Sequence, residues 1–487
     1  MNSVPHLPPR PTRKLVLGAL AIFGFCGCGE EPVQPPASPN IVLILADDLG
    51  FGDVGYNGSE IRTPAIDRLA AEGVKLDRFY AYPLCSPTRA ALMTGRSALS
   101  TGVLRPFEPW LESGLPLDEK LMPEYFREAG YQTFAVGKWH LGPNKKAYHP
   151  QRRGFDHFYG HLGGFLNHYL HTVWRRVDWQ RNGSTVHEEG YSTHLITAEA
   201  IDLIRNRDRD KPVFLYVSYS APHTPLQAPP EAIAEYDSID NETRRIFAAM
   251  VTEMDRGIAD LRVALEEEGL LDQTLLMFMS DNGGRPGLGA NNGPLRGEKS
   301  SAHEGGIRVP ALLRWPAELP QGATFDHRFV VEDVLPTLLS AAGLPGEPVK
   351  PLDGSDVWPA LADEAPFEPG PAVSARGGGP NFDFLYAYFS DEWKLVRARD
   401  DTGQLTLQLF RIRGDPYEQN DLAAAHPDVV KRLSTAFEAI PKAEMIGAGA
   451  APEADYGDNR GGSSSILPDD TAPTDIPYAE AEWRNVP

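Results

Sequence analysis

Four apolar segments of similar form recur along the chain, and each stops at polar residues. They are "NIVLILADD" (40–48), "YQTFAVGKWH" (131–140), "KPVFLYVSYSAPH" (211–223) and "QTLLMFMSDNGG" (273–284). Each is a short run rich in β-branched and large apolar side chains, which predicts a buried strand.

Helical patterns lie between these strands. The spacing of apolar residues predicts helices over about 64–73, 122–129, 196–206, 242–268 and 333–343. Strands that alternate with helices predict an α/β fold, with a mainly parallel sheet covered by helices on both faces. Such sheets bind ligands beyond the carboxyl ends of their strands, where the polar residues that end these four segments fall.

The pattern changes after residue 365. "FLYAYFSDEWKLVRAR" and "LTLQLFRIRGDPYEQNDL" predict antiparallel strands, and 427–440 predicts a closing helix. We therefore expect a large α/β domain over 40–365 and a small α+β subdomain over 366–440. Residues 441–487 are rich in Gly, Ala, Ser, Pro and Asp and predict an extended or disordered tail.

The N-terminus has the features of an export signal. A basic start precedes an apolar run at 15–25, which is shorter than the roughly 20 residues that span a bilayer. Gly27 before Cys28 resembles a bacterial lipoprotein signal over 1–28, with lipid on Cys28, and a Pro-rich linker follows over 29–39. We expect an exported protein, in the periplasm or at the outer membrane or cell surface, tethered by lipid; the alternative is a signal that is cleaved without lipidation.

The net charge is strongly acidic. The sequence contains 46 Lys and Arg against 67 Asp and Glu, a formal charge of −21. This balance argues against nucleic acid or an anionic membrane face as a general partner. Any cations that hold an anionic substrate must therefore be clustered locally.

Three cysteines occur in the chain, namely Cys26, Cys28 and Cys85. Processing of the signal leaves Cys85 as the one thiol of the folded body, so the body has no disulfide although export favours them. The ordinary interpretation of Cys85 is a small buried apolar residue. Its neighbours decide between this interpretation and a chemical role.

Polar oxygen donors follow two of the predicted strands. Asp47 and Asp48 end one strand, and Asp281 and Asn282 end another. Three carboxylates and an amide at one sheet edge form an all-oxygen site that suits Ca²⁺ or Mg²⁺, and Ca²⁺ tolerates irregular geometry better. Two ordinary Asx turns are the alternative for each pair alone. Two such pairs, each after an apolar strand, favour the cation.

A short helix is predicted directly after Cys85. Ser86 is suited to the N-cap, Pro87 to the first helical position, and Gly95 to the end. Cys85 would then precede a helix N-terminus, where free N–H groups favour an anion and lower the pKa of a thiol. Arg89, one turn into the helix, can reach the same place.

Four further cationic or titratable residues stand near predicted strand ends or in a Gly-rich loop. They are Lys138 and His140 in "GKWHLG", His223 in "SAPHTP" and Lys299 in "NGPLRGEKSSAHEGG". For each of these residues taken alone, the alternative to a functional role is an ordinary structural or solvated side chain. Together with Arg89 and a divalent cation they predict a local positive site that fits an anionic ester.

These motifs resemble a known family. Cys-x-Pro-x-Arg (85–89) followed by "AALMTGR" resembles the signature of type I sulfatases, and "ADDLGFGDVGYNGS", "GKWHLG", "SDNGG" and "EGGIRVP" are similar to that family in order and spacing. The similarity runs from about residue 40 to 440. "RRGFDHFYG" and "PLRGEKSSAHEGG" look closest to the arylsulfatase B (N-acetylgalactosamine-4-sulfatase) branch. The resemblance implies an alkaline-phosphatase-like fold, with 40–365 as the catalytic domain.

The resemblance also implies a modified nucleophile and a metal site. In this family the cysteine of the signature, here Cys85, is oxidised to formylglycine by a separate maturating enzyme, and the hydrated aldehyde carries two hydroxyls. By the same similarity a cation is held by Asp47, Asp48, position 85, Asp281 and Asn282; Ca²⁺ is expected, with Mg²⁺ as the alternative.

Roles for the remaining residues follow from the same resemblance. One hydroxyl attacks sulfur, and Asp281 accepts its proton. His223, with Lys299 beside it, protonates the leaving alcohol, and His140 accepts the proton of the second hydroxyl so that sulfate is expelled. Lys138 and Lys299 neutralise sulfate oxygens, and Arg89 orients the hydrate.

The stretch 163–183 is dense in His, aromatic and basic residues, including Arg175 and Arg176. It predicts a substrate cleft for a sulfated carbohydrate, such as galactosamine sulfate or a sulfated galactan, and an ordinarily packed surface loop is the alternative. Two rival functions stay open. The first is phosphoester or phosphonate hydrolysis. The second is sulfoglycan binding by a catalytically dead site, against which the complete set of motif residues argues.

Overall fold

The computed structural model describes residues 38–109, 111–173, 176–377, 384–390, 392–400, 402–446 and 474–475. The predicted signal over 1–28, most of the linker over 29–39, Arg175 and most of the predicted tail lie outside the described residues.

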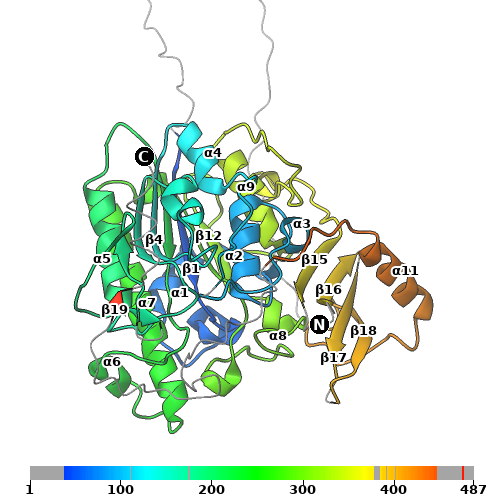
Figure 1. Cartoon of the computed structure of the whole chain (residues 1–487). Coiled ribbons are helices and arrows are strands. Elements are labelled where there is room, and N and C mark those ends of the chain that lie inside the picture. Colours follow the sequence, from blue (N-terminus) through cyan, green and yellow to red (C-terminus); the bar gives the residue numbers. More distant parts are fainter. Residues whose placement is uncertain are drawn as a thin grey trace, which may run out of the picture. The chain divides into compact units, whose positions relative to one another are not determined.

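A large mixed sheet forms the centre of the molecule (Figure 1). Five adjacent strands are parallel, in the order β11-β1-β10-β4-β5, and antiparallel pairs extend the sheet at both edges. In sheet order the strands are β13 (Ala323–Phe325), β2 (Val74–Leu76), β12 (Ala311–Arg314), β11 (Thr274–Ser280), β1 (Asn40–Ala46), β10 (Val213–Ser218), β4 (Gln132–Lys138), β5 (His157–His161), β8 (Gln180–Arg181) and β9 (Ser184–Thr185). All four apolar segments identified in the sequence are parallel strands, and the predicted fold class is confirmed.

Helices cover both faces of this sheet because its central strands are apolar on both sides. Along β1, Ile41 and Leu43 join one core cluster, whereas Val42 and Ile44 join the other. The first cluster includes residues of α2 (Cys85–Thr94), α4 (Met122–Glu128) and α9 (Val334–Ala341). The second includes residues of α1 (Pro64–Glu72), α5 (Ser192–Arg205) and α7 (Glu242–Glu267). Shorter helices are α3 (Ala98–Thr101), α6 (Pro230–Ala234), α8 (Glu304–Ile307) and α10 (Trp358–Ala362).

The C-terminal part forms a second, antiparallel sheet with one helix (Figure 1). Its strands are β15 (Ala372–Gly377), β16 (Phe384–Ser390), β17 (Trp393–Arg399) and β18 (Leu405–Arg411), followed by α11 (Pro427–Glu438). The sequence patterns predicted all of these elements except β15. Leu395 and Phe437 are buried in the same cluster as α2 and α9, so this sheet shares a core with the large domain.

Two small sheets complete the described structure. β3 (Phe79–Tyr80) pairs with β14 (Phe329–Val330), and β7 (Arg176–Val177) lies between β6 (Thr172–Val173) and β19 (Thr474–Asp475). Part of the predicted tail is therefore a short strand. No helix within the described ranges combines the length and the apolar character needed to cross a membrane.

Candidate active site

The two pairs of oxygen donors meet because their strands are neighbours. β1 and β11 pair in parallel up to Ala46 and Ser280, so the next residues of both strands emerge at one sheet edge. The backbone N–H of Asp48 donates to Asp281 Oδ1 over 3.3 Å, and Asn282 Nδ2 donates to Asp48 Oδ1 over 2.8 Å. The four side chains are buried and form one cluster of oxygens.

Asp48 leaves the strand in the left-handed region, with φ of 66°. Aspartate adopts this conformation more readily than most residues, because its short side chain forms local hydrogen bonds. His140, two residues beyond β4, has φ of 57°. At both positions the chain therefore leaves the extended conformation of the strand.

Cys85 is the first residue of α2, and this corrects the predicted start of the helix. Leu84 occupies the N-cap, and Ser86 lies inside the helix. The Ser86 hydroxyl donates to the carbonyl of His140 over 2.9 Å and accepts from Phe107 N over 3.1 Å. Ser86 therefore connects two site loops rather than capping α2.

The thiol of Cys85 lies at the centre of the cluster. Its Sγ is 3.5 Å from Asp47 Oδ1 and 3.5 Å from Lys299 Nζ. Burial, together with the charge of Asp281, raises the pKa of this thiol to about 12, although Lys138 and Lys299 act in the opposite direction. The expectation of a lowered thiol pKa at the helix N-terminus is therefore wrong for the unmodified side chain, because desolvation outweighs the helix dipole.

The donor set suits a hard cation. Ligand atoms of Asp47, Asp48, Cys85 and His223 lie within 4.8 Å of one another. Asn282 Oδ1 is buried and meets no hydrogen-bond partner among the described residues, which is costly unless a ligand compensates it. Carboxylate and amide oxygens are the donors that Ca²⁺ and Mg²⁺ prefer. The residues fit such an ion, and His223 joins the acidic group although the sequence did not predict it there.

Three cations neutralise the three carboxylates. Lys138 Nζ lies 2.6 Å from Asp47 Oδ2, and Lys299 Nζ lies 2.5 Å from Asp48 Oδ1. Burial alone would raise the pKa of Asp48, but the charge of Lys299 and the hydrogen bond from Asn282 hold it well below its ordinary value.

Arg89 completes this charge balance from α2. Its guanidinium donates to Asp281 Oδ2 through Nε over 3.1 Å and through Nη2 over 2.8 Å, and it donates to Ser218 Oγ over 2.6 Å. Its Nη2 is 4.0 Å from Asp47 Oδ1. Arg89 therefore orients Asp281 directly. Ser218, which ends β10, was missed, although a polar residue at a parallel strand end was the signal that could have found it.

The two histidines are held as neutral rings with different free nitrogens. His140 Nε2 lies 3.2 Å from the carbonyl oxygen of Phe107, and its buried Nδ1 meets no partner among the described residues. Burial, with Lys138 nearby, lowers the pKa of His140 well below its usual value. Assigning the ring proton to Nε2 satisfies the carbonyl and leaves Nδ1 as the acceptor.

His223 has the opposite assignment. Its Nδ1 lies 2.7 Å from the carbonyl oxygen of Thr224, and its Nε2 faces Asp48 Oδ2 at 3.6 Å. Burial lowers the pKa of His223 to about 3 despite the carboxylate of Asp48. Lys299, whose pKa is raised mainly by Asp48 against the effect of burial, is therefore the proton-carrying member of this pair.

The aromatic stretch 163–183 lies beside the site, but much of it is core. His168 Nε2 is 3.2 Å from the carbonyl of His223, which places the stretch against the His223 loop. Trp179 is buried, whereas Tyr169 is exposed, and the Phe165 ring stacks on His223 with centroids 6.4 Å apart. Arg176 is exposed on β7. Within this stretch, Phe165 therefore contacts a site residue, whereas Trp179 belongs to the core.

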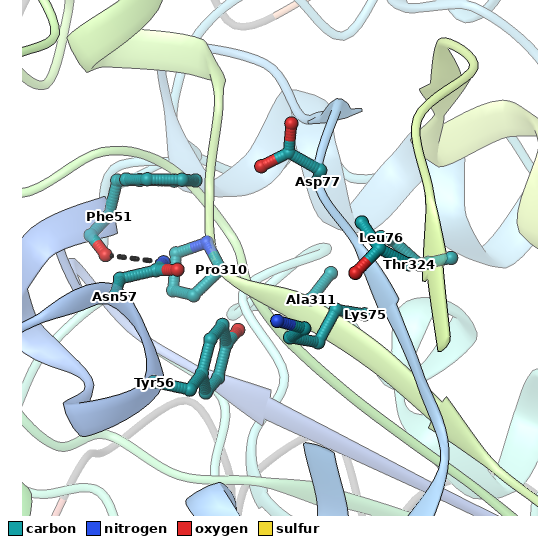
Figure 2. Close-up of a pocket in the computed structure, with 9 residues that line it drawn as sticks. All are labelled: Phe51, Tyr56, Asn57, Lys75, Leu76, Asp77, Pro310, Ala311 and Thr324. Carbon is teal, nitrogen blue, oxygen red and sulfur yellow. Dashed lines mark hydrogen bonds between the residues drawn. The ribbon is translucent and has the colours of Figure 1, made fainter. Parts of the chain in front are cut away.

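A cavity elsewhere in the protein is too small to compete as a substrate site. Phe51, Tyr56, Lys75 and Asp77 help to line it, and Asn57 Nδ2 donates to the carbonyl of Phe51 across one side (Figure 2). Its volume of about 40 Å³ has room for water rather than a sugar. None of the residues around Cys85 lines it.

Comparisons with known proteins agree with this geometry. The Sulfatase family model matches residues 39–344. Arylsulfatase J of Mus musculus is 36% identical over 458 residues, covering 83% of this chain and 76% of that protein. N-acetylgalactosamine-6-sulfatase of Mus musculus is 35% identical over 374 residues, covering 71% and 69%.

A solved structure is also similar to this chain over most of its length. The crystal structure of Ps i-CgsB in complex with k-i-k-neocarrahexaose is 36% identical with a TM-score of 0.78, covering 84% of this chain and 94% of that one. These comparisons do not support the narrower resemblance to the 4-sulfatase branch. They do support the family as a whole, and the chain belongs to the sulfatase family and is a sulfatase.

Proposed function

We propose that this sulfatase removes sulfate from a sulfated carbohydrate, with Cys85 oxidised to formylglycine and a divalent cation, Ca²⁺ in preference to Mg²⁺, bound beside it. The observation that carries the proposal is the environment of Cys85 Sγ, which lies 3.5 Å from both Asp47 and Lys299. Asn282 Oδ1, which has no hydrogen-bond partner in the described part of the chain, supports the cation. The structural similarity to Ps i-CgsB, solved with neocarrahexaose, supports the substrate class.

The chemistry divides between the bound groups and the chain. The oxidised side chain would supply a hydroxyl nucleophile for sulfur, and a cation held by Asp47, Asp48, Asp281, Asn282 and position 85 would withdraw negative charge from it. Lys138 and Lys299 flank the position of Sγ and neutralise sulfate oxygens as charge shifts toward them. Arg89 holds Asp281 in place through two hydrogen bonds, so that its carboxylate can accept the nucleophile's proton.

Proton transfer uses the residues on either side of the nucleophile. Lys299 carries a proton and lies beside His223 at Asp48, so this pair donates to the leaving oxygen of the sugar. His140 Nδ1 is unprotonated and has no partner within the described part of the chain, so it accepts the proton that must be removed when sulfate leaves. His223 thus acts in the protonation of the leaving alcohol, and His140 acts in the later release of sulfate.

Oxidation of Cys85 requires a maturating enzyme that acts before folding. Cys85, Ser86 and Arg89 are buried, with exposed fractions of 2%, 0% and 0%. A separate enzyme cannot reach this segment in the folded protein. We therefore infer that the unfolded chain, through its Cys-x-Pro-x-Arg segment, is the partner of that enzyme.

Mass spectrometry of the peptide containing residue 85 tests the modification, and sulfate release tests the substrate class. We expect an aldehyde at position 85 and release of sulfate from sulfated galactosamine or galactan oligosaccharides. An aryl sulfate should be cleaved faster than the matching aryl phosphate. An unmodified thiol in fully active protein would contradict the mechanism, and activity confined to phosphate esters would contradict the substrate class.

The variant Cys85→Ser gives a second test. A serine hydroxyl can accept a sulfuryl group, but it has no second hydroxyl whose ionisation expels sulfate. We expect at most one equivalent of alcohol released per protein, measured as a burst without steady-state turnover. Multiple turnovers at the wild-type rate would contradict the proposed nucleophile.

We also propose that the protein is exported and anchored by lipid on Cys28. The sequence of the N-terminal 28 residues supports this. Metabolic labelling with a fatty acid should mark the native protein, and Cys28→Ser should remove the label. An unlabelled native protein with a cleaved N-terminus would indicate plain secretion.

A further inference from the structure

Lys299 is carried by a loop that other parts of the chain hold in place. The Lys299 loop, defined as residues 293–303, lies between the end of β11 and helix α8. The backbone N–H of Lys299 donates to the carbonyl of Gly284 over 3.1 Å, and that of Ser300 donates to the carbonyl of Pro83 over 2.8 Å. Ser300 has a left-handed φ of 75°. The loop conformation is therefore set by its contacts rather than by local preference.

A fully buried charge cluster fixes the end of this loop to the C-terminal sheet. Lys394 of β17 lies 2.7 Å from Glu304 Oε1 and 2.8 Å from Glu418 Oε1, and all three side chains have an exposed fraction of 0%. Glu304 is the first residue of α8, directly after the loop. Figure 1 shows α8 beside the C-terminal sheet.

Further hydrogen bonds make this connection specific. Glu418 Oε2 accepts from the backbone N–H of Glu304 over 2.8 Å, and the hydroxyl of Tyr80 donates to Glu304 Oε2 over 3.0 Å. Tyr80 belongs to β3, which precedes the Cys85 segment. Glu418 itself holds an unfavourable left-handed φ of 55°. The cluster therefore joins the C-terminal sheet, the Lys299 loop and the strand before Cys85.

A second contact from the same sheet reaches the loop directly. Gln408 of β18 has its Oε1 2.8 Å from His303 Nε2, and His303 Nδ1 lies 3.0 Å from Ser301 Oγ. This chain of hydrogen bonds ends two residues from Lys299. These hydrogen bonds do not include the catalytic cluster, because neither Gln408 nor His303 contacts Cys85 or the carboxylates around it.

We propose that Lys394 and Gln408 of the C-terminal sheet are positioning residues for Lys299 in sulfate ester cleavage. Buried ion pairs add little to stability compared with apolar residues, but they require one geometry of the groups they join. The inference rests on the proposed role of Lys299. It assigns the C-terminal sheet a part in catalysis although that sheet supplies no atom to the reacting group.

The test is a double-mutant cycle on an aryl sulfate, with matured protein. Lys299→Ala should lower kcat/KM about 100-fold. Gln408→Ala should lower it about 10-fold, because small displacements of a catalytic group are costly, while the melting temperature stays close to that of wild type. In the Lys299→Ala background, Gln408→Ala should change kcat/KM less than twofold, since there is no Lys299 left to position.

Thr406→Ala is the matched control. Thr406 lies on the same face of β18 two residues earlier, and its hydroxyl bonds only to the carbonyl of Ala398 among the hydrogen bonds described for it. We expect it to leave kcat/KM unchanged in both backgrounds. Lys394→Met should behave as Gln408→Ala does, with a larger loss; if it does not fold, the Gln408 cycle decides.

The outcomes distinguish the catalytic role of Lys299 from the positioning role of Lys394 and Gln408. Suppose that Lys299→Ala is slow as expected. If Gln408→Ala is then fully active, or lowers kcat/KM equally in both backgrounds, only the positioning role is overturned. A Lys299→Ala variant with unchanged kcat/KM would overturn the proposed role of Lys299 and the inference with it. Non-additive losses support both.

Discussion

At the scale of single residues, the site is a balance of buried charges. Three carboxylates and three cations stand within hydrogen-bond reach of one another, and each charge has a partner of opposite sign. Pairing is what makes such burial tolerable. Among the described residues, the buried acceptor Asn282 Oδ1 has no donor, as expected for the ligand of the proposed cation.

A prediction for Asn282 follows at this scale. Asn282→Leu removes the oxygen, and we expect it to lose the rise in melting temperature that added Ca²⁺ produces in the wild type. Asn282→Asp keeps an oxygen at the same place and should retain the rise. Thermal unfolding with and without Ca²⁺, after chelation, measures both variants. Equal Ca²⁺ responses of Asn282→Leu and wild type would remove Asn282 from the metal site.

At the scale of elements, the hydroxyl of one tyrosine connects the segment before α2 to α3 and to the turn before α9. The hydroxyl of Tyr82, which precedes α2, donates to Glu332 Oε1, and it accepts from the backbone N–H of Ala98 in α3. Glu332 lies in the turn before α9 and is buried. Burial raises its pKa to about 8, although the hydrogen bond from Tyr82 acts in the opposite direction.

This shift predicts a pH dependence of stability. The ordinary pKa of the carboxyl is 4.5, so between about pH 4.5 and 8 the unfolded chain ionises Glu332 while the folded protein keeps its proton. The contribution of Glu332 is therefore fully present below pH 4.5 and is lost as the pH rises through this window. Glu332→Gln stays neutral and still accepts from Tyr82.

Denaturant unfolding at pH 5 and pH 7.5 measures this effect. The stability of Glu332→Gln relative to wild type should increase by about 3 kcal/mol between the two pH values. Glu347→Gln, a change at an exposed position, should show no such increase. A constant difference between Glu332→Gln and wild type would show that Glu332 is ionised in the folded protein.

At the scale of the whole molecule, the C-terminal sheet and the large sheet are one folding unit. Leu395, Leu409 and Phe437 are buried in the cluster that also contains residues of α2 and α9. The buried cluster around Lys394 adds a polar connection to α8. The boundary near residue 365 separates two patterns of secondary structure, but it does not separate two cores.

A truncation tests this unity. A chain that ends at residue 365 would expose the apolar surface around α2 and α9, and we expect it to aggregate or to lose its cooperative melting transition. The chain with its C-terminal sheet should show a single calorimetric transition. A soluble, cooperatively folding 38–365 fragment would contradict the shared core.

The sequence by itself determined the parallel strands and most of the helices, because both depend on local periodicity that survives without tertiary context. The strand β1 is an example, since its unbroken apolar run requires cover on both faces. The sequence also predicted that Asp48, Asp281 and Asn282 would lie together, because polar side chains at parallel strand ends are brought to one edge by the topology. The family resemblance added the expectation of a modified Cys85 and of the roles of the individual residues.

Tertiary structure alone decided the properties that depend on burial and on contacts between distant segments. It placed Cys85 inside α2, raised the pKa of its thiol, and buried Trp179. It also raised the pKa of Lys299 and lowered that of His223. It also paired Lys394 with Glu304, which directly follows the Lys299 loop and lies 90 residues away in the sequence. Desolvation and long-range pairing leave no periodic signal along the chain, so no local pattern could have revealed them.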